Sequence, residues 1–417
     1  MYKSSNKFKI FVSAYACEPN LGSEIGVGWH WVIEMSKYFD LWVLTRQSNK
    51  ESIENWQLEN PVPNKINFVY YDLPKKLRFW KKGMRGVRTY YVLWQKLTNK
   101  IVKQVMEDNG IEIFHLLTYG NALWPISKYG QEKFFIWGPT GAGDIIPEEF
   151  SKHYSRKGQI IEKLRRLSKS TLPLNTGFKR RCSNANLIFC KTQTALNSIP
   201  EEYRNKAIVF TDVAVDPVEI LDILPKSTCS DQILKYLAVG RLDAWRGFDL
   251  LIEAFAKAAK INTNIRLEIL GKGSDKSRLQ GLIAKHRMES TIALGGQVSM
   301  SEYYQKMAAS DVVVNPALKE GAVTTAFDSM SLGKPLICIE TGGYTRYFNN
   351  EYAVVIPLNS RKEVISNLSK GILQLTDTDL RLEKGLTARE KGKQFNWETK
   401  GQQIQKAIKN SYIQVAT

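Results

Sequence analysis

The stretch AVGRLDAWRGFDLLIEAF, residues 238–255, joins the end of a β-strand, a loop with two arginines and the beginning of an amphipathic helix. Short apolar runs alternate with helix-period segments along nearly the whole chain. This alternation predicts an α/β fold with parallel sheets covered by helices on both faces. The expected strands are 9–16, 41–44, 66–71, 113–117, 134–137 and 187–190, followed by 234–239, 265–270, 291–294, 312–314, 336–339 and 353–356.

The two series of strands predict two similar α/β domains in tandem, which is consistent with 417 residues and about 150 residues per domain. The segment 211–232 has two prolines and little periodicity, and we place the domain boundary there. We expect a first domain over 1–210, a second over 211–390, and a C-terminal helix over 391–417 that packs back on the first.

The composition is that of a globular protein, with 43% hydrophobic and 24% charged residues. It excludes disordered, collagen-like and disulfide-scaffold classes. Five scattered cysteines without a CxxC pair argue against a zinc site and favour a reducing compartment. The first apolar run is too short for a signal peptide, and no stretch reaches the length of a spanning helix, so we expect a cytoplasmic protein.

The net charge of +18 is concentrated in the first half, where residues 1–210 hold 32 basic and 18 acidic residues. Residues 74–100 contain nine basic residues and no acid, and residues 151–181 contain ten basic residues and one acid. Such a field attracts a polyanion, either nucleic acid or an anionic membrane surface.

Four glycine-containing loops follow expected strands: 20–29, 238–247, 315–324 and 342–348. Parallel sheets bind ligands at the carboxyl ends of their strands, next to helix N-termini. Arg241 and Arg246 suit a diphosphate, because guanidinium groups form bidentate bonds to phosphate oxygens. Taken singly, each loop is equally compatible with an ordinary glycine turn, and each arginine with a solvated surface position.

In combination these stretches resemble family 4 glycosyltransferases, the retaining nucleotide-sugar enzymes of the GT-B fold. The resemblance rests on GRL…RG, LEILGKG, SDVVVNPALKEG, an acid eight positions after Glu320, and LGKPLICIETGG. ACEPNLGSEIGVGW and WGPTGAGD look like a bacterial branch that acts on surface polysaccharides. The resemblance implies two Rossmann-like domains facing each other across a cleft, an acceptor domain first and a donor domain second.

The resemblance also implies roles for individual residues. Arg241 and Arg246 would contact the donor diphosphate and act in catalysis. At the position of Arg246 the family usually has lysine. Glu320 would act in catalysis as well and would contact the donor sugar. Asp328, where the family has glutamate, would bind the ribose. The remaining donor-site residues are glycines and backbone positions of the strand-end loops: Gly22, Ser23, Gly240, Gly271, Gly321, Ala322, Val323 and Thr324.

On the acceptor side, His115 matches part of a histidine motif and is a catalytic candidate, although many members place that histidine at the position of Leu117. A structural histidine is the alternative. Glu24 and Thr118 are further acceptor-side candidates, and Glu24 equally suits the first turn of a helix.

The implied reaction is transfer of a sugar from a UDP- or GDP-sugar to a glycan hydroxyl with retention, in which the leaving diphosphate helps to deprotonate the acceptor. Arginine stabilises charge on the leaving group. We expect no metal and no other cofactor, since the implied reaction needs no DxD metal motif and the sequence shows no His/Cys/Asp cluster with ligand spacing. The alternatives are an inactive glycosyltransferase-like partner subunit, a nucleic-acid-binding protein without a known module, and a phosphorylase or sugar-phosphate synthase of the same fold.

The 74–86 loop places two aromatic residues in a basic cluster, a composition suited to an interfacial membrane surface. We therefore expect a peripheral protein on the inner face of the plasma membrane, with a lipid-linked acceptor. The apolar positions of 87–105 predict a core-packed helix next to this loop. The expected membrane-surface residues are Lys75, Lys76, Arg78, Phe79, Trp80, Lys81 and Lys82.

Overall fold

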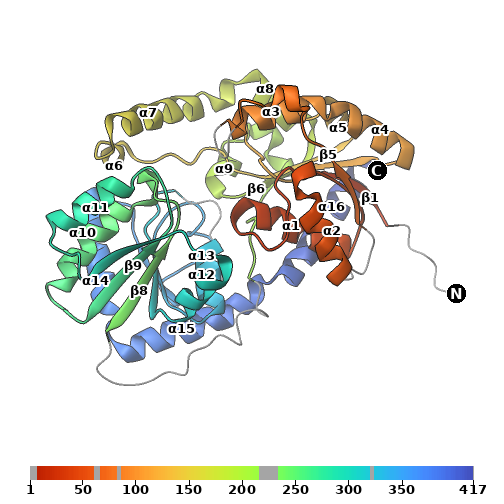
Figure 1. Cartoon of the computed structure of the whole chain (residues 1–417). Helices are drawn as coiled ribbons and strands as arrows, with labels where there is room; N and C mark the ends of the chain where they lie inside the picture. Colours follow the sequence, from red (N-terminus) through yellow and green to blue (C-terminus); the bar gives the residue numbers. More distant parts are fainter. Residues whose placement is uncertain (1–6, 61–65, 82–85, 216–232, 320–323, 417) are drawn as a thin grey trace. The chain divides into compact units, whose positions relative to one another are not determined.

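The computed structural model describes residues 7–60, 66–81, 86–215, 233–319 and 324–416. The contacts divide the chain into two compact units. The first comprises Met1–Gly143, Ser170–Asp212 and Trp397–Thr417, and the second comprises Asp144–Lys169 and Val213–Asn396. Each unit has its own sheet and its own core (Figure 1).

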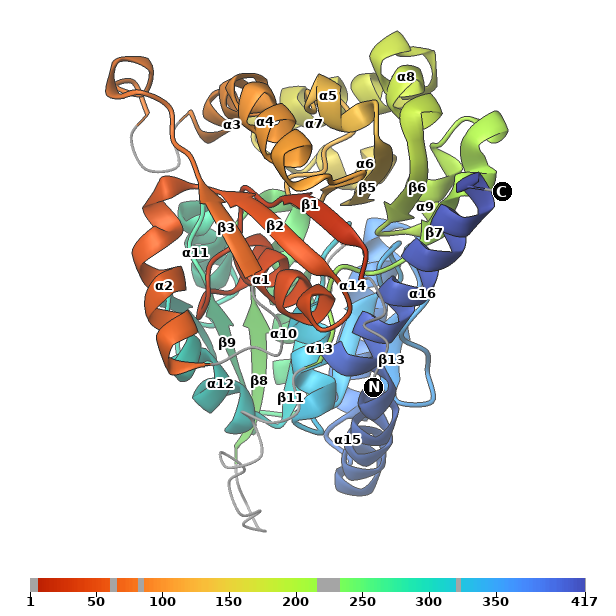
Figure 2. The same cartoon turned by 90° about the vertical axis from the view of Figure 1, so that its right-hand side faces the viewer.

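The first unit is built on a parallel sheet in the order β3-β2-β1-β4-β5-β6-β7 (Figure 2). The strands are β1 (Lys9–Ser13), β2 (Asp40–Thr45), β3 (Ile66–Tyr70), β4 (Ile113–Leu116), β5 (Phe134–Thr140), β6 (Ala185–Cys190) and β7 (Ala207–Val209). Its helices are α1 (Ser23–Ser36), α2 (Lys50–Glu59), α3 (Val87–Leu97), α4 (Asn99–Asn109), α5 (Lys128–Gln131), α8 (Thr176–Asn184), α9 (Gln193–Asn197) and α16 (Trp397–Ala416).

The second unit has a parallel sheet in the order β10-β9-β8-β11-β12-β13. The strands are β8 (Leu234–Val239), β9 (Ile265–Leu270), β10 (Ile292–Gly296), β11 (Val312–Asn315), β12 (Leu336–Ile339) and β13 (Ala353–Ile356). Its helices are α6 (Glu148–Ser151), α7 (Arg156–Ser170), α10 (Phe248–Ala259), α11 (Lys276–Lys285), α12 (Met300–Ala308), α13 (Thr324–Ser331), α14 (Arg361–Gln374) and α15 (Thr378–Gly392).

These elements confirm the predicted α/β class and the two parallel sheets. Each of the twelve expected strands overlaps a strand of the structure, whereas β7, a three-residue strand at the edge of the first sheet, was not predicted. A short edge strand carries too few residues for a periodic signal.

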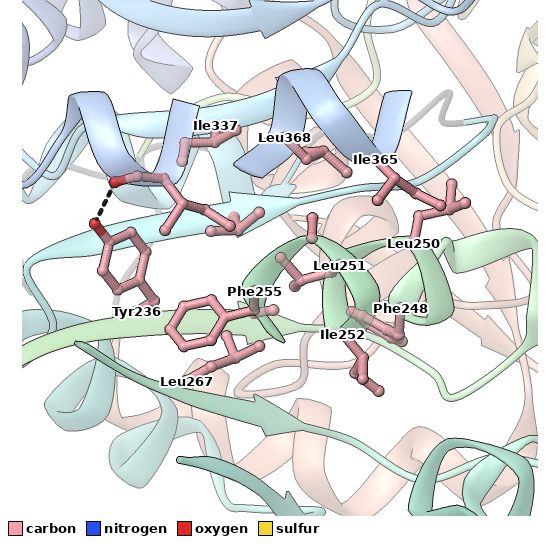
Figure 3. Packing of buried hydrophobic residues seen from close by; sticks show 14 of the residues in the cluster. Tyr236, Phe248, Leu250, Leu251, Ile252, Phe255, Leu267, Ile337, Ile365 and Leu368 are labelled. Carbon is pink, nitrogen blue, oxygen red and sulfur yellow. Dashed lines mark hydrogen bonds between the residues drawn. The ribbon is translucent and has the colours of Figure 1, made fainter. Parts of the chain in front are cut away.

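Helices α10 and α14 pack against the second sheet through aliphatic and aromatic side chains (Figure 3). The face of α10 that meets the sheet includes Leu251 and Phe255, both fully buried. The Tyr236 hydroxyl, which lies among these side chains, donates a 2.7 Å hydrogen bond to the carbonyl of Ile372. Burial of such side chains is the main stabilising contribution to a domain of this size.

Residues 144–169 lie in the sequence range expected for the first domain but pack in the second unit. Ile146, Phe150 and Tyr154 are buried in the core of the second unit, among residues of α10 and its neighbours. The backbone N–H of Arg361 also donates a 2.8 Å hydrogen bond to Glu149. Three buried apolar side chains therefore attach residues 144–169 to the core of the second unit. The residues that flank this segment in the sequence belong to the first unit.

Helix α16 packs in the first unit. Its Ile404 and Ile408 are fully buried, and the ring of Trp397 stacks on His30 of α1 at 4.9 Å. Lys400 is buried as well and donates a 2.7 Å hydrogen bond to the carbonyl of Thr211. Burial lowers the pKa of Lys400 to about 7.

Candidate functional site

The carboxyl ends of β8 and β9 meet at Gly240 and Gly271, and no side chain fits at Gly271. Gly271 has φ +137°, and a Cβ there would lie 1.9 Å from the carbonyl oxygen of Gly240. The Gly240 N–H in turn bonds the carbonyl of Leu270 at 3.0 Å. This close approach brings the two backbones together at the strand ends, where parallel sheets bind ligands.

The loop after β8 turns back beside Gly240 through a short 3₁₀ helix, Ala244–Arg246. A Cβ on Gly240 would lie 3.5 Å from the Arg246 side chain, which places this guanidinium group at the strand end. The guanidinium also lies 4.2 Å from the Trp245 ring, in a cation–π contact. Gly247, with φ +68°, allows the turn into α10 against the carbonyl of Pro316.

Arg241 directly follows the strand end, but its side chain is mostly exposed and pairs with Asp243 at 3.0 Å. An exposed ion pair of this kind contributes little to stability. Its guanidinium group is therefore available to rearrange toward an anion.

The loops after β8 and β11 are joined, since the Leu318 N–H bonds the carbonyl of Trp245 at 3.0 Å. Lys319, the next residue, lies 3.6 Å from the buried carboxylate of Glu162 on α7 and 5.6 Å from the Trp245 ring. Glu162 also pairs with Arg165. Burial, reinforced by Arg165 and Lys169, lowers the pKa of Lys319 to about 8, although Glu162 opposes this shift.

The predicted positions Glu320, Gly321, Ala322 and Val323 lie outside the described residues. Thr324 is the first residue of α13, and Asp328 is buried within that helix. The Tyr303 hydroxyl of α12 donates a 2.6 Å hydrogen bond to Asp328 Oδ2. Burial and the Asp328 charge raise the pKa of Tyr303 well above its usual value, so the hydroxyl keeps its proton.

In the first unit, Gly22 precedes α1 and Ser23 adopts φ +60°, a left-handed conformation uncommon for a residue with a side chain. The Glu24 carboxylate accepts a 2.9 Å hydrogen bond from the N–H of Tyr119. It also lies 3.8 Å from Lys191, which pairs with Asp212 at 2.5 Å. Glu24 therefore ties the start of α1 to the loop after β4.

The structure does not support an acceptor contact by His115 or Thr118. His115 is fully buried, and its Nε2 is 2.7 Å from the Gly138 carbonyl, to which it donates. Burial lowers its pKa to about 4, so the ring stays neutral near pH 7. Thr118 is buried too, and its hydroxyl oxygen accepts the Ala16 N–H at 3.0 Å. Both are packing residues because their strand-end positions lie beneath α1.

Some side chains of the basic 75–81 segment are exposed, and others pack against the first unit. Lys75, Lys76 and Phe79 are exposed, whereas Trp80 packs against the core of the first unit. Lys81 lies 5.2 Å from the Tyr90 ring. Arg78 pairs with Asp72 at 3.3 Å, and Lys82 lies outside the described residues. Trp80 is partly buried, so only part of its ring can belong to the expected surface. Helix α3, which follows, buries Tyr90, Tyr91 and Trp94, as predicted for a core-packed helix.

A cavity of about 550 Å³ opens at the amino ends of β8, β9 and β10, beside Lys235, Arg266 and Ile292. It therefore lies at the sheet edge opposite the strand-end loops.

Within the described ranges, histidine, cysteine and acidic side chains form no group of three that could hold a metal ion. Of the helices in those ranges, none is both long and apolar enough to cross a membrane.

Several residues of these clusters were not predicted from the sequence: Glu162, Tyr303, Lys319, Lys191 and Asp212. Lys191 follows an expected strand directly, so the rule that carboxyl ends share one sheet edge would have found it. Glu162 and Tyr303 have no such signal, because their partners are distant in sequence.

The profile of the family described as "Glycosyl transferases group 1" matches residues 224–389. An uncharacterized glycosyltransferase of Methanocaldococcus jannaschii is 24% identical over 72% of this chain and 75% of its own length. The GtfA subunit of a UDP-N-acetylglucosamine–peptide N-acetylglucosaminyltransferase from Limosilactobacillus reuteri is 29% identical over 39% of this chain. That match spans only 33% of the GtfA subunit.

Solved structures are similar along nearly the whole chain. The lipopolysaccharide outer core galactosyltransferase WaaB has a TM-score of 0.64 at 14% identity, covering 97% of this chain and 99% of WaaB. HepE of Anabaena, solved with UDP and glucose, has a TM-score of 0.60 at 14% identity, covering 97% and 99%. The fold is therefore GT-B. The family profile indicates similarity to group 1 glycosyltransferases over residues 224–389.

Proposed function

We propose that this chain is a retaining, metal-independent glycosyltransferase of family 4. It transfers a hexose from a nucleotide-diphosphate sugar to a hydroxyl of a lipid-linked or cell-surface glycan, at the inner face of the plasma membrane. The observation that carries the proposal is the strand-end arrangement of the second unit, where Gly240, Gly271 and Arg246 adjoin the loop that leads through Lys319 to α13.

In this proposal the diphosphate lies beside Gly240 and Gly271, where no side chain occupies the space, and Arg246 with Arg241 stabilises the charge that develops on it. Glu320 contacts the donor sugar and Asp328 the ribose. Because Asp328 is buried and bonded to Tyr303, we infer that it reaches the ribose through the tyrosine hydroxyl or a water molecule. UDP is the first nucleotide to test, since HepE was solved with UDP and GtfA is named for a UDP-sugar.

The test is a thermal-shift screen of the full chain with UDP, GDP, ADP, dTDP and CMP and their common sugars, with and without EDTA. A stabilising nucleotide whose effect survives EDTA supports a metal-free donor site. Complete loss of the shift in EDTA would show that a metal is required. No shift with any nucleotide would contradict the donor site.

Catalysis is tested with Glu320→Ala. We expect donor binding to persist and sugar transfer to fall to background, measured as nucleotide release in the presence of a glycolipid acceptor. Near-normal turnover of this variant would remove Glu320 from the site. Glu289→Ala, an exposed glutamate at the opposite edge of the second sheet, is the matched control.

The same buried Asp328–Tyr303 pair favours a second function, that of a glycosyltransferase-like partner subunit without activity. A wild-type chain that binds no nucleotide but co-purifies with an active transferase would favour this alternative. Donor-dependent turnover by the purified chain alone would exclude it.

Membrane contact by the first unit is proposed through Lys75, Lys76 and Phe79, the exposed residues of the basic segment. Replacing Lys75 and Lys76 by serine is expected to weaken binding of the protein to anionic vesicles. Unchanged vesicle binding would contradict a role for this segment.

A further inference from the structure

Helix α7 of the second unit has its polar and apolar faces reversed relative to an ordinary surface helix. Its exposed stripe carries Ile160, Leu164 and Leu167, whose residues are 60%, 61% and 61% exposed. Their i, i+4, i+7 spacing places them on one face of the helix. A helix that packed on the core with this stripe would bury all three, so the exposed stripe requires a separate explanation.

The opposite face of α7 is ionic and is held by the protein. Glu162, Arg165 and Lys169 share that face by their spacing. Glu162 is buried and pairs with Arg165 and Lys319, and Lys169 donates to the carbonyl of Asp144. These contacts fix the rotation of the helix and hence the outward direction of its leucines.

Cations border the apolar stripe on both sides. With 3.6 residues per turn, Arg156 and Lys163 fall on one side of the stripe and Lys157 on the other, and all three are exposed. Beside the stripe, Lys152, Lys163 and Arg166 line a cavity of about 290 Å³ together with Gln159, Ser151 and Ile160. Arg166 is anchored there by Glu148 at 3.0 Å.

We propose that α7 is an interfacial helix that docks the second unit on an anionic lipid bilayer (α7 is labelled in Figure 1). Ile160, Leu164 and Leu167 enter the acyl boundary, while the bordering cations and the cavity hold lipid phosphates. The occupant is a bilayer rather than nucleic acid, because α7 exposes aliphatic side chains and has no aromatic residue on which bases could stack.

This inference goes beyond the proposed sugar transfer and does not depend on it. The contact lies in the second unit, on an element other than the basic 75–81 segment. A chain without catalytic activity would dock in the same way, so failure of nucleotide binding and failure of vesicle binding are separate results.

The experiment is co-sedimentation of the full chain with vesicles of phosphatidylcholine alone and of phosphatidylcholine mixed with phosphatidylglycerol. We expect binding to the mixed vesicles only, with release at high salt. Leu164→Ser/Leu167→Ser should lower the partition coefficient by roughly tenfold or more. The matched control is Leu382→Ser/Leu386→Ser, two leucines of α15 that are 54% and 65% exposed.

Thermal unfolding reports independently whether the leucine variant folds. If it does not fold, a second variant, Lys157→Ser/Lys163→Ser, keeps the test valid. We expect it to weaken binding to mixed vesicles. Wild-type binding by both folded variants overturns the proposal, as does equal binding of the wild type to both kinds of vesicle. A wild-type dimer that the leucine variant dissociates would also overturn it, because the stripe would then be an interface between copies.

Discussion

Helices α10 and α7 both belong to the second unit, but they attach to it by opposite means. Helix α10 buries Leu251 and Phe255 against the sheet. It also buries Asp249, which pairs with Arg278 and Arg361, but most of its buried residues are apolar. Helix α7 is held through the buried carboxylate of Glu162 and exposes its leucines. Hydrophobic periodicity therefore predicts a helix in both cases, but the periodicity does not identify which face of the helix is buried in the protein.

The largest expected effect is on the α10 side. Leu251→Ala should lower the free energy of unfolding by about 2–5 kcal/mol, because it leaves a cavity in a close-packed core. The measurement is urea denaturation followed by circular dichroism. Leu164→Ala is the matched change on α7 and should alter the same quantity by less than about 0.5 kcal/mol. Equal losses for the two variants would abolish the distinction between the helices.

A smaller effect is expected from the ionic attachment of α7. Glu162→Gln removes one partner of a largely buried pair and leaves Lys319 without it, which should cost about 1–3 kcal/mol of unfolding free energy. Adding Lys319→Met should recover part of that loss, and the double-mutant cycle measures the coupling. Glu148→Gln, in a more exposed pair with Arg166, is the control and should have little effect. A cycle with no coupling energy would mean that this pair does not hold α7.

A third expected effect, confined to alkaline pH, is a pH dependence that comes from Lys319. Its pKa is about 8 in the folded chain and about 10.5 in the unfolded chain, so the unfolded chain binds more protons between these values. Stability therefore rises with pH from about 8 to 10.5 on account of this group. Lys319→Met should flatten that rise in unfolding experiments over the same pH range. The buried Lys400 acts in the same direction from about pH 7 upward and remains in the variant as an internal reference. An unchanged slope would contradict the lowered pKa of Lys319.

Much of the donor-side geometry could be predicted from the sequence. Gly240, Gly271 and Arg246 lie at a strand end, because a parallel α/β alternation determines which loops share one edge of the sheet. The depth of His115 could not be predicted, for a related reason. A position at a strand end determines at which edge of the sheet a residue lies. How deeply its side chain is buried depends on the helix that covers that edge. Here α1 covers it, with the ring of Trp31 5.9 Å from His115.

The sequence by itself determined the α/β class, the two sheets and the strand-end loops, because these follow from local periodicity and from glycines that allow close backbone approach. Only the tertiary structure decided that residues 144–169 join the second core, that Glu162 meets Lys319, and that Tyr303 bonds Asp328. The physical reason is that each of these contacts pairs residues that are distant in sequence. Their energies depend on burial, which no local pattern of residues encodes.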